Sequence, residues 1–329
     1  MLGSKVSPSV LSLRNLCGLS CAFLSLALAA CGSSSSSAGA SSSASGSSAA
    51  GLPAATVKNA TIINGLAKDP AAAALVPTSW RAKGTLQVAS NATYAPDEFV
   101  ASDNSTIVGW DPDLGHALAK LLGLKFQFVN TQFAEIIPGL AANRYDLGMS
   151  SATVKPVREK VVDFVTDFLA GYAFMVPAGS SVQPANIAAL CGLTVAVEKG
   201  SVEAAAAQQQ ATACAKGKTL DIQTYPDQSG VNLALSSNRA QVAFADSPVI
   251  AYQVKLSQGK FAQSGGVFQA GPEGIEIPKG NQGMDKALAA AMTKLISSGM
   301  YQKILSNWGV ASGAITQSQL EPPGSGSGS

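Results

Sequence analysis

Few residues in this sequence could carry out acid–base or nucleophilic chemistry. The single histidine, His116, falls on the polar side of an expected helix, where we expect an exposed residue. Glu203 and Asp246 are the two carboxylates that could serve as a positioned acid or base. The sequence has no Cys and His cluster at metal-ligand spacing, no phosphate-binding glycine loop, and no Gly-x-Ser-x-Gly or Ser-x-x-Lys string at a suitable place. We therefore expect binding rather than catalysis, with neither a metal nor another cofactor.

The first thirty residues have the pattern of an export signal. Lys5 and Arg14 precede an apolar run of about 16 residues. This run is shorter than the roughly 20 residues that span a bilayer. The run ends in Leu-Ala-Ala before Cys31, which resembles the lipobox of bacterial lipoproteins. We predict that residues 1–30 are removed and that Cys31 carries lipid. An ordinary secretory signal with an incidental cysteine is the alternative.

A flexible tether is predicted to follow the lipid site. Residues 33–50 are only Ser, Ala and Gly, which cannot bury a core. Asp69 and Pro70 then predict a short helix, with Asp69 as N-cap and Pro70 at the first helical position. We expect residues 31–77 to hold the lipid, the tether and this helix, and the protein to work outside the cell, anchored to the cytoplasmic membrane.

Two cysteines lie outside the signal and the lipid site. Cys191 and Cys214 are 23 positions apart, and in an oxidising compartment such a pair favours a disulfide. A zinc site is the alternative, but it would want further Cys or His ligands, and the chain has one histidine.

The composition of the 329 residues predicts a packed core, because 47% are hydrophobic and 13% charged. The chain holds 22 Lys plus Arg and 20 Asp plus Glu. Without Lys5 and Arg14 the positive count is 22 − 2 = 20, so the mature chain is neutral. The absence of a basic block argues against a nucleic-acid surface and a polybasic membrane patch. Small neutral or zwitterionic ligands fit better, and we expect a monomer.

Hydrophobic periodicity predicts an α/β chain in two units with a largely parallel sheet. The expected strands are 86–89, 125–129, 145–149, 161–164, 172–176, 194–197, 220–224, 240–245 and 275–278, and the expected helices are 113–122, 133–142, 157–160, 202–210, 230–236, 284–298 and 301–308.

Residues 78–310 resemble the amino-acid-binding, family 3 solute-binding proteins of bacterial ABC importers. Six strings in the family's order carry this resemblance: residues 86–96, 107–114, 136–140, 144–147, 150–158 and 162–164. The second string reads Ile-Val-Gly-Trp-Asp-Pro-Asp-Leu and resembles the family's Gly-aromatic-acid-x-acid-Leu signature, with Trp110 in place of a more usual Phe.

This resemblance implies a periplasmic-binding-protein type II-like fold, in which two α/β lobes are joined by two crossing strands and close on a ligand between them. Lobe 1 would comprise residues 78–177 and 275–312, lobe 2 residues 178–274, and residues 313–329 a flexible tail. The crossovers would fall near residues 176–177 and 273–274.

The resemblance also implies the ligand-binding residues. Arg158 would bind the ligand α-carboxylate and Asp246 the α-ammonium, although Asp246 is also placed to cap a helix. The other implied ligand residues are Asn91, Tyr94, Phe133, Ser150, Ser151, Thr153, Gly200, Ser201 and Val202. Trp110 is expected in the lobe 1 core.

The implied ligand is an amino acid with a neutral polar side chain. Asn91 stands where members for cationic amino acids often have an aspartate, and an amide cannot supply that charge. Asp97 and Glu203 could restore acidity, so the charge of the ligand stays open. The implied partners are an ABC permease and its cytoplasmic ATPase. A sensory receptor for a signalling partner and, less favoured, a dehydratase-type enzyme are the alternatives.

Overall fold

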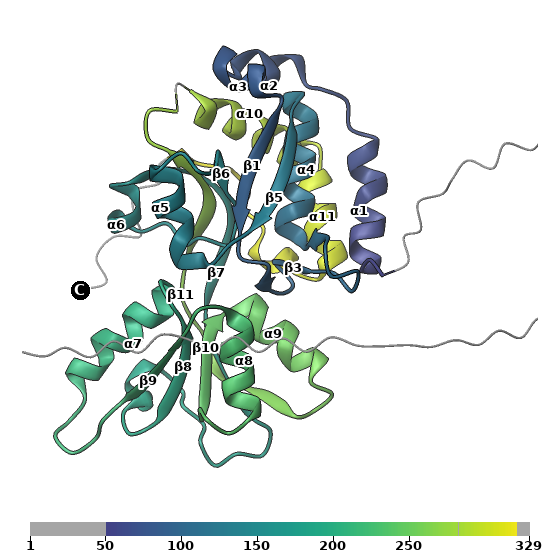
Figure 1. Ribbon diagram of the computed structural model, residues 1–329. Helices are drawn as coiled ribbons and strands as arrows, with labels where there is room; N and C mark the ends of the chain where they lie inside the picture. Colours follow the sequence, from purple (N-terminus) through teal and green to yellow (C-terminus); the bar gives the residue numbers. More distant parts are fainter. Residues whose placement is uncertain (1–50, 282, 321–329) are drawn as a thin grey trace, which may run out of the picture. The chain divides into compact units, whose positions relative to one another are not determined.

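The computed structural model describes residues 51–281 and 283–320. The signal peptide, Cys31, the tether up to residue 50 and the tail beyond 320 lie outside the described residues, as do the predictions made for them. Its helices are α1 (Ala54–Asn64), α2 (Pro70–Leu75), α3 (Thr78–Lys83), α4 (Trp110–Leu122), η1 (Phe133–Glu135), α5 (Ile136–Ala141), α6 (Pro156–Glu159), η2 (Ile187–Leu190), α7 (Val202–Ala213), α8 (Gln228–Ser236), α9 (Ser247–Leu256), α10 (Met284–Ser297), α11 (Met300–Trp308) and η3 (Ala311–Gly313). Its strands are β1 (Thr85–Ser90), β2 (Thr93–Tyr94), β3 (Glu98–Val100), β4 (Ile107–Val108), β5 (Lys125–Asn130), β6 (Leu147–Gly148), β7 (Val162–Pro177), β8 (Thr194–Glu198), β9 (Asp221–Tyr225), β10 (Val242–Asp246) and β11 (Phe261–Pro278) (Figure 1).

Eight of these strands form one mixed sheet, in the order β5-β1-β6-β11-β7-β10-β8-β9. The pairs β1/β5, β1/β6, β8/β10 and β8/β9 are parallel. The long strands β7 and β11 pair antiparallel along most of their length. The sequence predicted a largely parallel sheet. The expected strands 161–164 and 172–176 are parts of one strand, β7, and its antiparallel pairing with β11 makes the sheet mixed.

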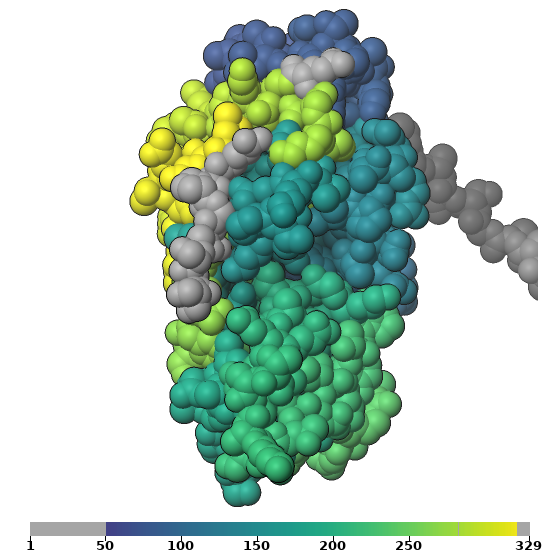
Figure 2. Space-filling model, turned by 90° about the vertical axis from the view of Figure 1, so that its left-hand side faces the viewer, coloured from purple at the N-terminus to yellow at the C-terminus, as the bar shows by residue number. Residues whose placement is uncertain are grey.

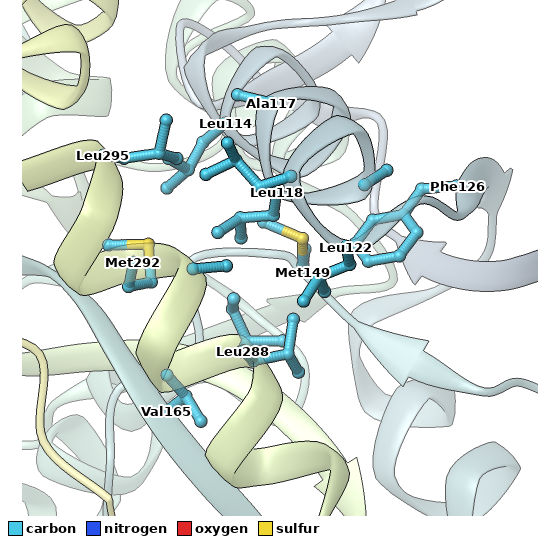
Figure 3. Packing of buried hydrophobic residues seen from close by; sticks show 14 of the residues in the cluster. Leu114, Ala117, Leu118, Leu122, Phe126, Met149, Val165, Leu288, Met292 and Leu295 are labelled. Atoms are coloured by element: carbon cyan, nitrogen blue, oxygen red, sulfur yellow. The ribbon is translucent and has the colours of Figure 1, made fainter. Parts of the chain in front are cut away.

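Lobe 1 is built on β5, β1 and β6, together with the start of β7 and the end of β11. Leu114, Leu118 and Leu122 recur every four residues on α4, so they lie along one face of the helix. Figure 3 shows them packed against Leu288 and Met292 of α10, and all five side chains are buried. This core holds α4 and α10 together on lobe 1. The carboxyl ends of β1 and β6 point away from these helices, toward lobe 2.

Lobe 2 is built on β10, β8 and β9 with the remaining parts of β7 and β11, and α7, α8 and α9 belong to it (Figure 1). The predicted disulfide is present: Cys191 and Cys214 are bonded, with 5.6 Å between their Cα atoms. It joins the end of η2 to the end of α7, so it braces lobe 2 alone.

The two long strands pass between the lobes. Tyr172 to Met175 of β7 pair with β10 of lobe 2, whereas Val162 to Phe168 pair with the end of β11 in lobe 1. β7 therefore contributes to both lobes; the crossovers near residues 176–177 and 273–274 stay predictions. Register shifts in β11 fall between Ser264 and Phe268, between Phe268 and Gly271, and between Glu273 and Gly274.

Helices precede the first strand. The predicted helix after Asp69 is confirmed as α2, with the Asp69 side chain accepting from the Ala72 N–H at 2.9 Å. Helices α1 and α3 were not expected from the sequence. α1 buries Ala55, Asn59 and Ile63, spaced four residues apart, against lobe 1. No helix within the described ranges is long and apolar enough to cross a membrane.

Candidate functional site

A small cavity lies between the two lobes. Its lining is Asn91, Tyr94, Glu98, Phe133, Ser150, Ser151, Thr153, Arg158, Glu198, Ser201, Val202, Glu203 and Asp246. Asn91 directly follows β1, Ser150 lies two residues after β6, and Glu198 and Asp246 end β8 and β10. Ligands of α/β sheets bind at such carboxyl ends. The space-filling view shows the green part of lobe 2 against the teal part of lobe 1 along one boundary (Figure 2).

Ten of the eleven ligand-binding residues predicted from the sequence line this cavity: Asn91, Tyr94, Phe133, Ser150, Ser151, Thr153, Arg158, Ser201, Val202 and Asp246. Gly200 does not line it, but its carbonyl accepts a hydrogen bond from Arg158. Trp110 is buried in lobe 1, where it stacks on Phe168, and His116 is exposed, both as expected. The structure brings the predicted residues together; their roles toward a ligand stay predictions.

Arg158 is buried at the edge of the cavity, with 9% of its surface exposed. Its guanidinium donates to the Thr153 carbonyl at 2.8 Å and to the Gly200 carbonyl of lobe 2 at 3.1 Å. Its guanidinium carbon lies 5.1 Å from the centre of the Phe133 ring, at cation–π distance. Two backbone carbonyls and one aromatic face therefore hold a planar cation in a fixed orientation, as bidentate recognition of a carboxylate requires.

Asp246 faces Arg158's lobe from the end of β10. Its side chain does not cap α9; it accepts instead from the Tyr94 hydroxyl of lobe 1 at 2.9 Å, and that hydroxyl accepts from the Asp246 N–H at 3.1 Å. Burial raises the pKa of Asp246 to about 6, although the hydrogen bonds from Tyr94 and Glu203 and the charge of Arg158 act the other way. Burial also raises the pKa of Glu203, and the charge of Asp246 and the hydrogen bond to Asp246 act in the same direction.

A second hydrogen-bonded group surrounds Asn91. The Asn91 amide nitrogen donates to Glu198 Oε1 of lobe 2 at 2.9 Å, and its oxygen accepts from the Thr93 hydroxyl at 2.6 Å. The Asn91 backbone N–H donates to Ser150 Oγ at 3.0 Å, and that hydroxyl donates to Glu98 Oε1 at 2.7 Å. Two carboxylates, one from each lobe, are thus joined through one asparagine and one serine.

Ser151 has an unusual backbone conformation, with φ of 50°. A residue other than glycine in this left-handed region is strained and needs support from its surroundings. Two buried carboxylates give that support: Asp111 accepts from the Ser151 N–H at 3.1 Å and Asp97 from its hydroxyl at 3.0 Å. Asp97 therefore supports the site from behind and does not line the cavity, so it does not supply the acidity considered for it from the sequence.

Glycine is required where α7 begins. Gly200 has φ of 83°, and a Cβ on it would come within 3.1 Å of the Ala134 side chain of lobe 1. Ser201 follows as N-cap, its hydroxyl accepting from the Ala204 N–H at 3.0 Å. The start of α7 can therefore approach lobe 1 closely, with its first backbone N–H groups beside the cavity.

Sequence reasoning missed two lining residues, Glu98 and Glu198. Burial raises the pKa of both, and the charges of neighbouring carboxylates raise it further. Glu198 directly follows the expected strand 194–197, and this position could have marked it as a candidate, because side chains after parallel strands meet at one sheet edge. Glu98 begins the short strand β3, which was not expected from the sequence, and gave no comparable signal.

The geometry is that of a two-lobe binding protein, with a cavity lined mainly by polar residues at the lobe boundary. Residues 86–311 match bacterial extracellular solute-binding proteins, family 3. The chain is 32% identical to the arginine-binding protein ArgT of Corynebacterium glutamicum over 256 residues, which are 76% of this chain and 83% of that protein.

Two solved structures have similar folds. A mutant of ArgBP from T. maritima is 26% identical, with a TM-score of 0.65 over 70% of this chain and 97% of that one. The ancestral amino acid-binding protein AncCDT-1, a precursor of cyclohexadienyl dehydratase, is 30% identical, with a TM-score of 0.63 over 70% and 97%.

The chain belongs to family 3 of the bacterial extracellular solute-binding proteins, and the family and fold predicted from the sequence are confirmed.

Proposed function

We propose that this protein is an extracytoplasmic receptor that captures an amino acid and delivers it to an ABC permease with a cytoplasmic ATPase. The observation that carries the proposal is the cavity between the lobes, where a buried, oriented Arg158 lies with the carboxylate of Asp246 from the other lobe. A zwitterion offers one group to each: its carboxylate to Arg158 and its ammonium to Asp246. Both groups lose water on binding, and both recover charge-assisted hydrogen bonds.

The acidity of the cavity supports a cationic side chain on this amino acid. Among the described residues that line it, four are carboxylic acids, Glu98, Glu198, Glu203 and Asp246, and Arg158 is the one permanent cation. The sequence favoured a neutral polar ligand because Asn91 has no charge, but Glu98 and Glu198 bring two further carboxyl groups to the cavity. The relatives ArgT and ArgBP point the same way.

The remaining lining residues have matching roles in the proposal. Tyr94 and Phe133 would enclose the side chain of the ligand between aromatic faces. Ser150, Ser151 and Thr153 from lobe 1, and the α7 start at Ser201 and Val202 from lobe 2, would complete the hydrogen bonds of its α-carboxylate and ammonium. Closure of the lobes would then depend on the ligand bridging them.

We further propose that the receptor works without catalysis and is held at the membrane by lipid on Cys31. The relatives reported above are binding proteins, and AncCDT-1 is itself an amino acid-binding protein. For the anchor, a Cys31→Ser variant expressed in a bacterial host should move from the membrane fraction to the soluble extracytoplasmic fraction. Unchanged membrane association of the variant would refute lipidation at this cysteine.

A thermal-shift panel tests the binding function. The purified protein is screened with the twenty amino acids, polyamines and small organic acids. At a hundredfold excess over its Kd, a ligand adds about 2.7 kcal/mol, which should raise the Tm of a domain of this size by roughly 5–11 °C. Shifts with arginine or lysine are the expected result. A panel without any shift, from folded protein free of co-purified ligand, would contradict the proposal.

A further inference from the structure

Glu198 and Asn91 form a direct hydrogen bond between the two lobes inside the cavity. Glu198 ends β8 in lobe 2, and Asn91 follows β1 in lobe 1. The Asn91 amide nitrogen and Glu198 Oε1 are 2.9 Å apart, and the two side chains are only 2% and 4% exposed. A carboxylate from lobe 2 therefore reaches across the cavity to the asparagine of lobe 1.

The hydrogen bonds of Asn91 determine which end of its amide faces Glu198. Its oxygen accepts from the Thr93 hydroxyl at 2.6 Å, and this leaves the N–H₂ end toward Glu198. An N–H₂ group repels a cation and attracts a carboxylate. Asn91 is therefore suited to hold Glu198 in place and is poorly suited to accept a positive group itself.

Two other carboxylates of the cavity, Asp246 and Glu203, are already bonded to each other, and Asp246 also accepts from Tyr94. Glu98 accepts from the Ser150 hydroxyl through one oxygen, and its other oxygen is buried with no hydrogen-bond partner among the described residues. Glu98 lies on lobe 1, so it is Glu198 that brings a carboxylate from the opposite lobe to Asn91. Glu198 is held by a single neutral amide, so a cation can approach it without breaking a bond between carboxyl groups.

A nearby cation would stabilise the ionised form of Glu198. Its ionised form is disfavoured by burial first and then by the charges of Asp227 and Asp246. Arg158, which could neutralise it, donates instead to the carbonyls of Thr153 and Gly200. A positive group brought by the ligand would supply the missing charge.

We propose that Glu198 of lobe 2 receives the distal positive charge of the ligand side chain, and that Asn91 of lobe 1 positions Glu198 for this contact. The inference rests on the proposed function, since it names the residue that selects among amino acids in the same cavity. The residue that recognises the side-chain charge of the ligand then lies on lobe 2. Closure on a cationic side chain pairs Glu198 with a positive charge, whereas closure on a neutral one leaves it with the hydrogen bond from Asn91.

Arginine and citrulline test this assignment, because citrulline has nearly the shape of arginine with a neutral urea in place of the guanidinium. Isothermal titration calorimetry measures both affinities for the wild-type protein, for Glu198→Gln and for Glu276→Gln. The last variant is the matched control: it makes the same change at a glutamate that is equally buried, on β11, but does not line the cavity. Circular dichroism and thermal melts establish that each variant is folded.

Wild type should prefer arginine to citrulline, and Glu198→Gln should lower arginine affinity by about 10- to 100-fold, the loss expected for a hydrogen bond to a charged group. Its citrulline affinity should change by less than about threefold, since a neutral ligand makes no charged contact there. Glu276→Gln should keep the wild-type preference.

Glu198→Asp and Asn91→Ala test the same contact with milder changes and serve if Glu198→Gln does not fold. Both keep the carboxylate charge but displace it, so each should reduce the preference for arginine partly.

An unchanged arginine-to-citrulline ratio in folded Glu198→Gln, or in both milder variants, would overturn the assignment. So would a wild-type protein that binds neutral amino acids and no cationic ones, while leaving the receptor function intact. If wild type binds no amino acid at all, the proposed function fails together with this inference.

Discussion

Glu276 gives the sharpest stability prediction, because it is a buried acid outside the cavity. It lies on β11 opposite Gly148 of β6, is 1% exposed, and its Oε2 has no hydrogen-bond partner within the described chain. Burial raises its pKa from 4.5 to about 7, although the charge of Arg158 opposes the rise. The folded protein therefore favours the protonated acid. The protonated acid contributes its full share of the folding stability below about pH 4.5, and this contribution is lost as the pH rises through about 7.

The magnitude follows from the size of this shift. A rise of about 2.5 pKa units corresponds to about 3 kcal/mol, of which about 2.5 kcal/mol is lost between pH 5 and pH 8. Glu276→Gln keeps the shape of the side chain and cannot ionise, so this loss should disappear. The variant should equal wild type within about 1 kcal/mol at pH 5 and exceed it by about 2–3 kcal/mol at pH 8.

Urea unfolding at pH 5 and pH 8 measures the difference directly, with Glu135→Gln as control because that glutamate is exposed. The control should follow wild type at both pH values. Equal pH dependence in wild type and Glu276→Gln would refute the reasoning, and so would a variant that is less stable than wild type at pH 8.

Three further predictions concern the bonds that hold the fold and the site. Replacing Cys191 and Cys214 by Ser opens the disulfide loop and should lower the free energy of unfolding by about 3 kcal/mol, measured by urea unfolding without reductant; no change would contradict the bracing of lobe 2. Asn59→Ala removes the α1 contacts to Asp113 at 2.8 Å and to the Ile304 carbonyl at 3.2 Å, and should cost about 1–3 kcal/mol, with limited proteolysis cutting at α1; wild-type protease resistance would show that α1 is held otherwise. Tyr94→Phe removes the hydroxyl that orients Asp246 and should weaken amino-acid binding about 5- to 20-fold in calorimetry without unfolding the protein; undiminished affinity would mean that Asp246 needs no such support.

The sequence predicted the fold best where one local feature decides the structure. Asp69 with Pro70 marks the start of α2, and the leucines of α4 mark a buried helix face. Helix α1 was not predicted because the centre of its buried face is Asn59, whose polarity breaks the hydrophobic pattern. That asparagine is buried only because Asp113 and the Ile304 carbonyl receive its N–H groups, and these lie 54 and 245 residues away.

The candidate site shows the same limit. Arg158 and Asp246 were found through motifs that lie next to them in the chain. Glu198 was not, because its meaning comes from Asn91, which is 107 residues away and belongs to the other lobe. The charge of the cavity depends on which strand ends meet across the lobe boundary, and this became visible only in the folded chain.

The most direct test of the receptor function is calorimetric titration of cationic amino acids into the ligand-free purified protein, into Arg158→Ala, and into Arg144→Ala as a control with a more exposed arginine. The account predicts one site per chain in wild type and in Arg144→Ala, and an affinity at least about 100-fold weaker in Arg158→Ala, because a buried charge-assisted contact to the ligand carboxylate is lost. Wild-type affinity in Arg158→Ala, or the absence of binding by every amino acid to folded wild-type protein, would contradict it.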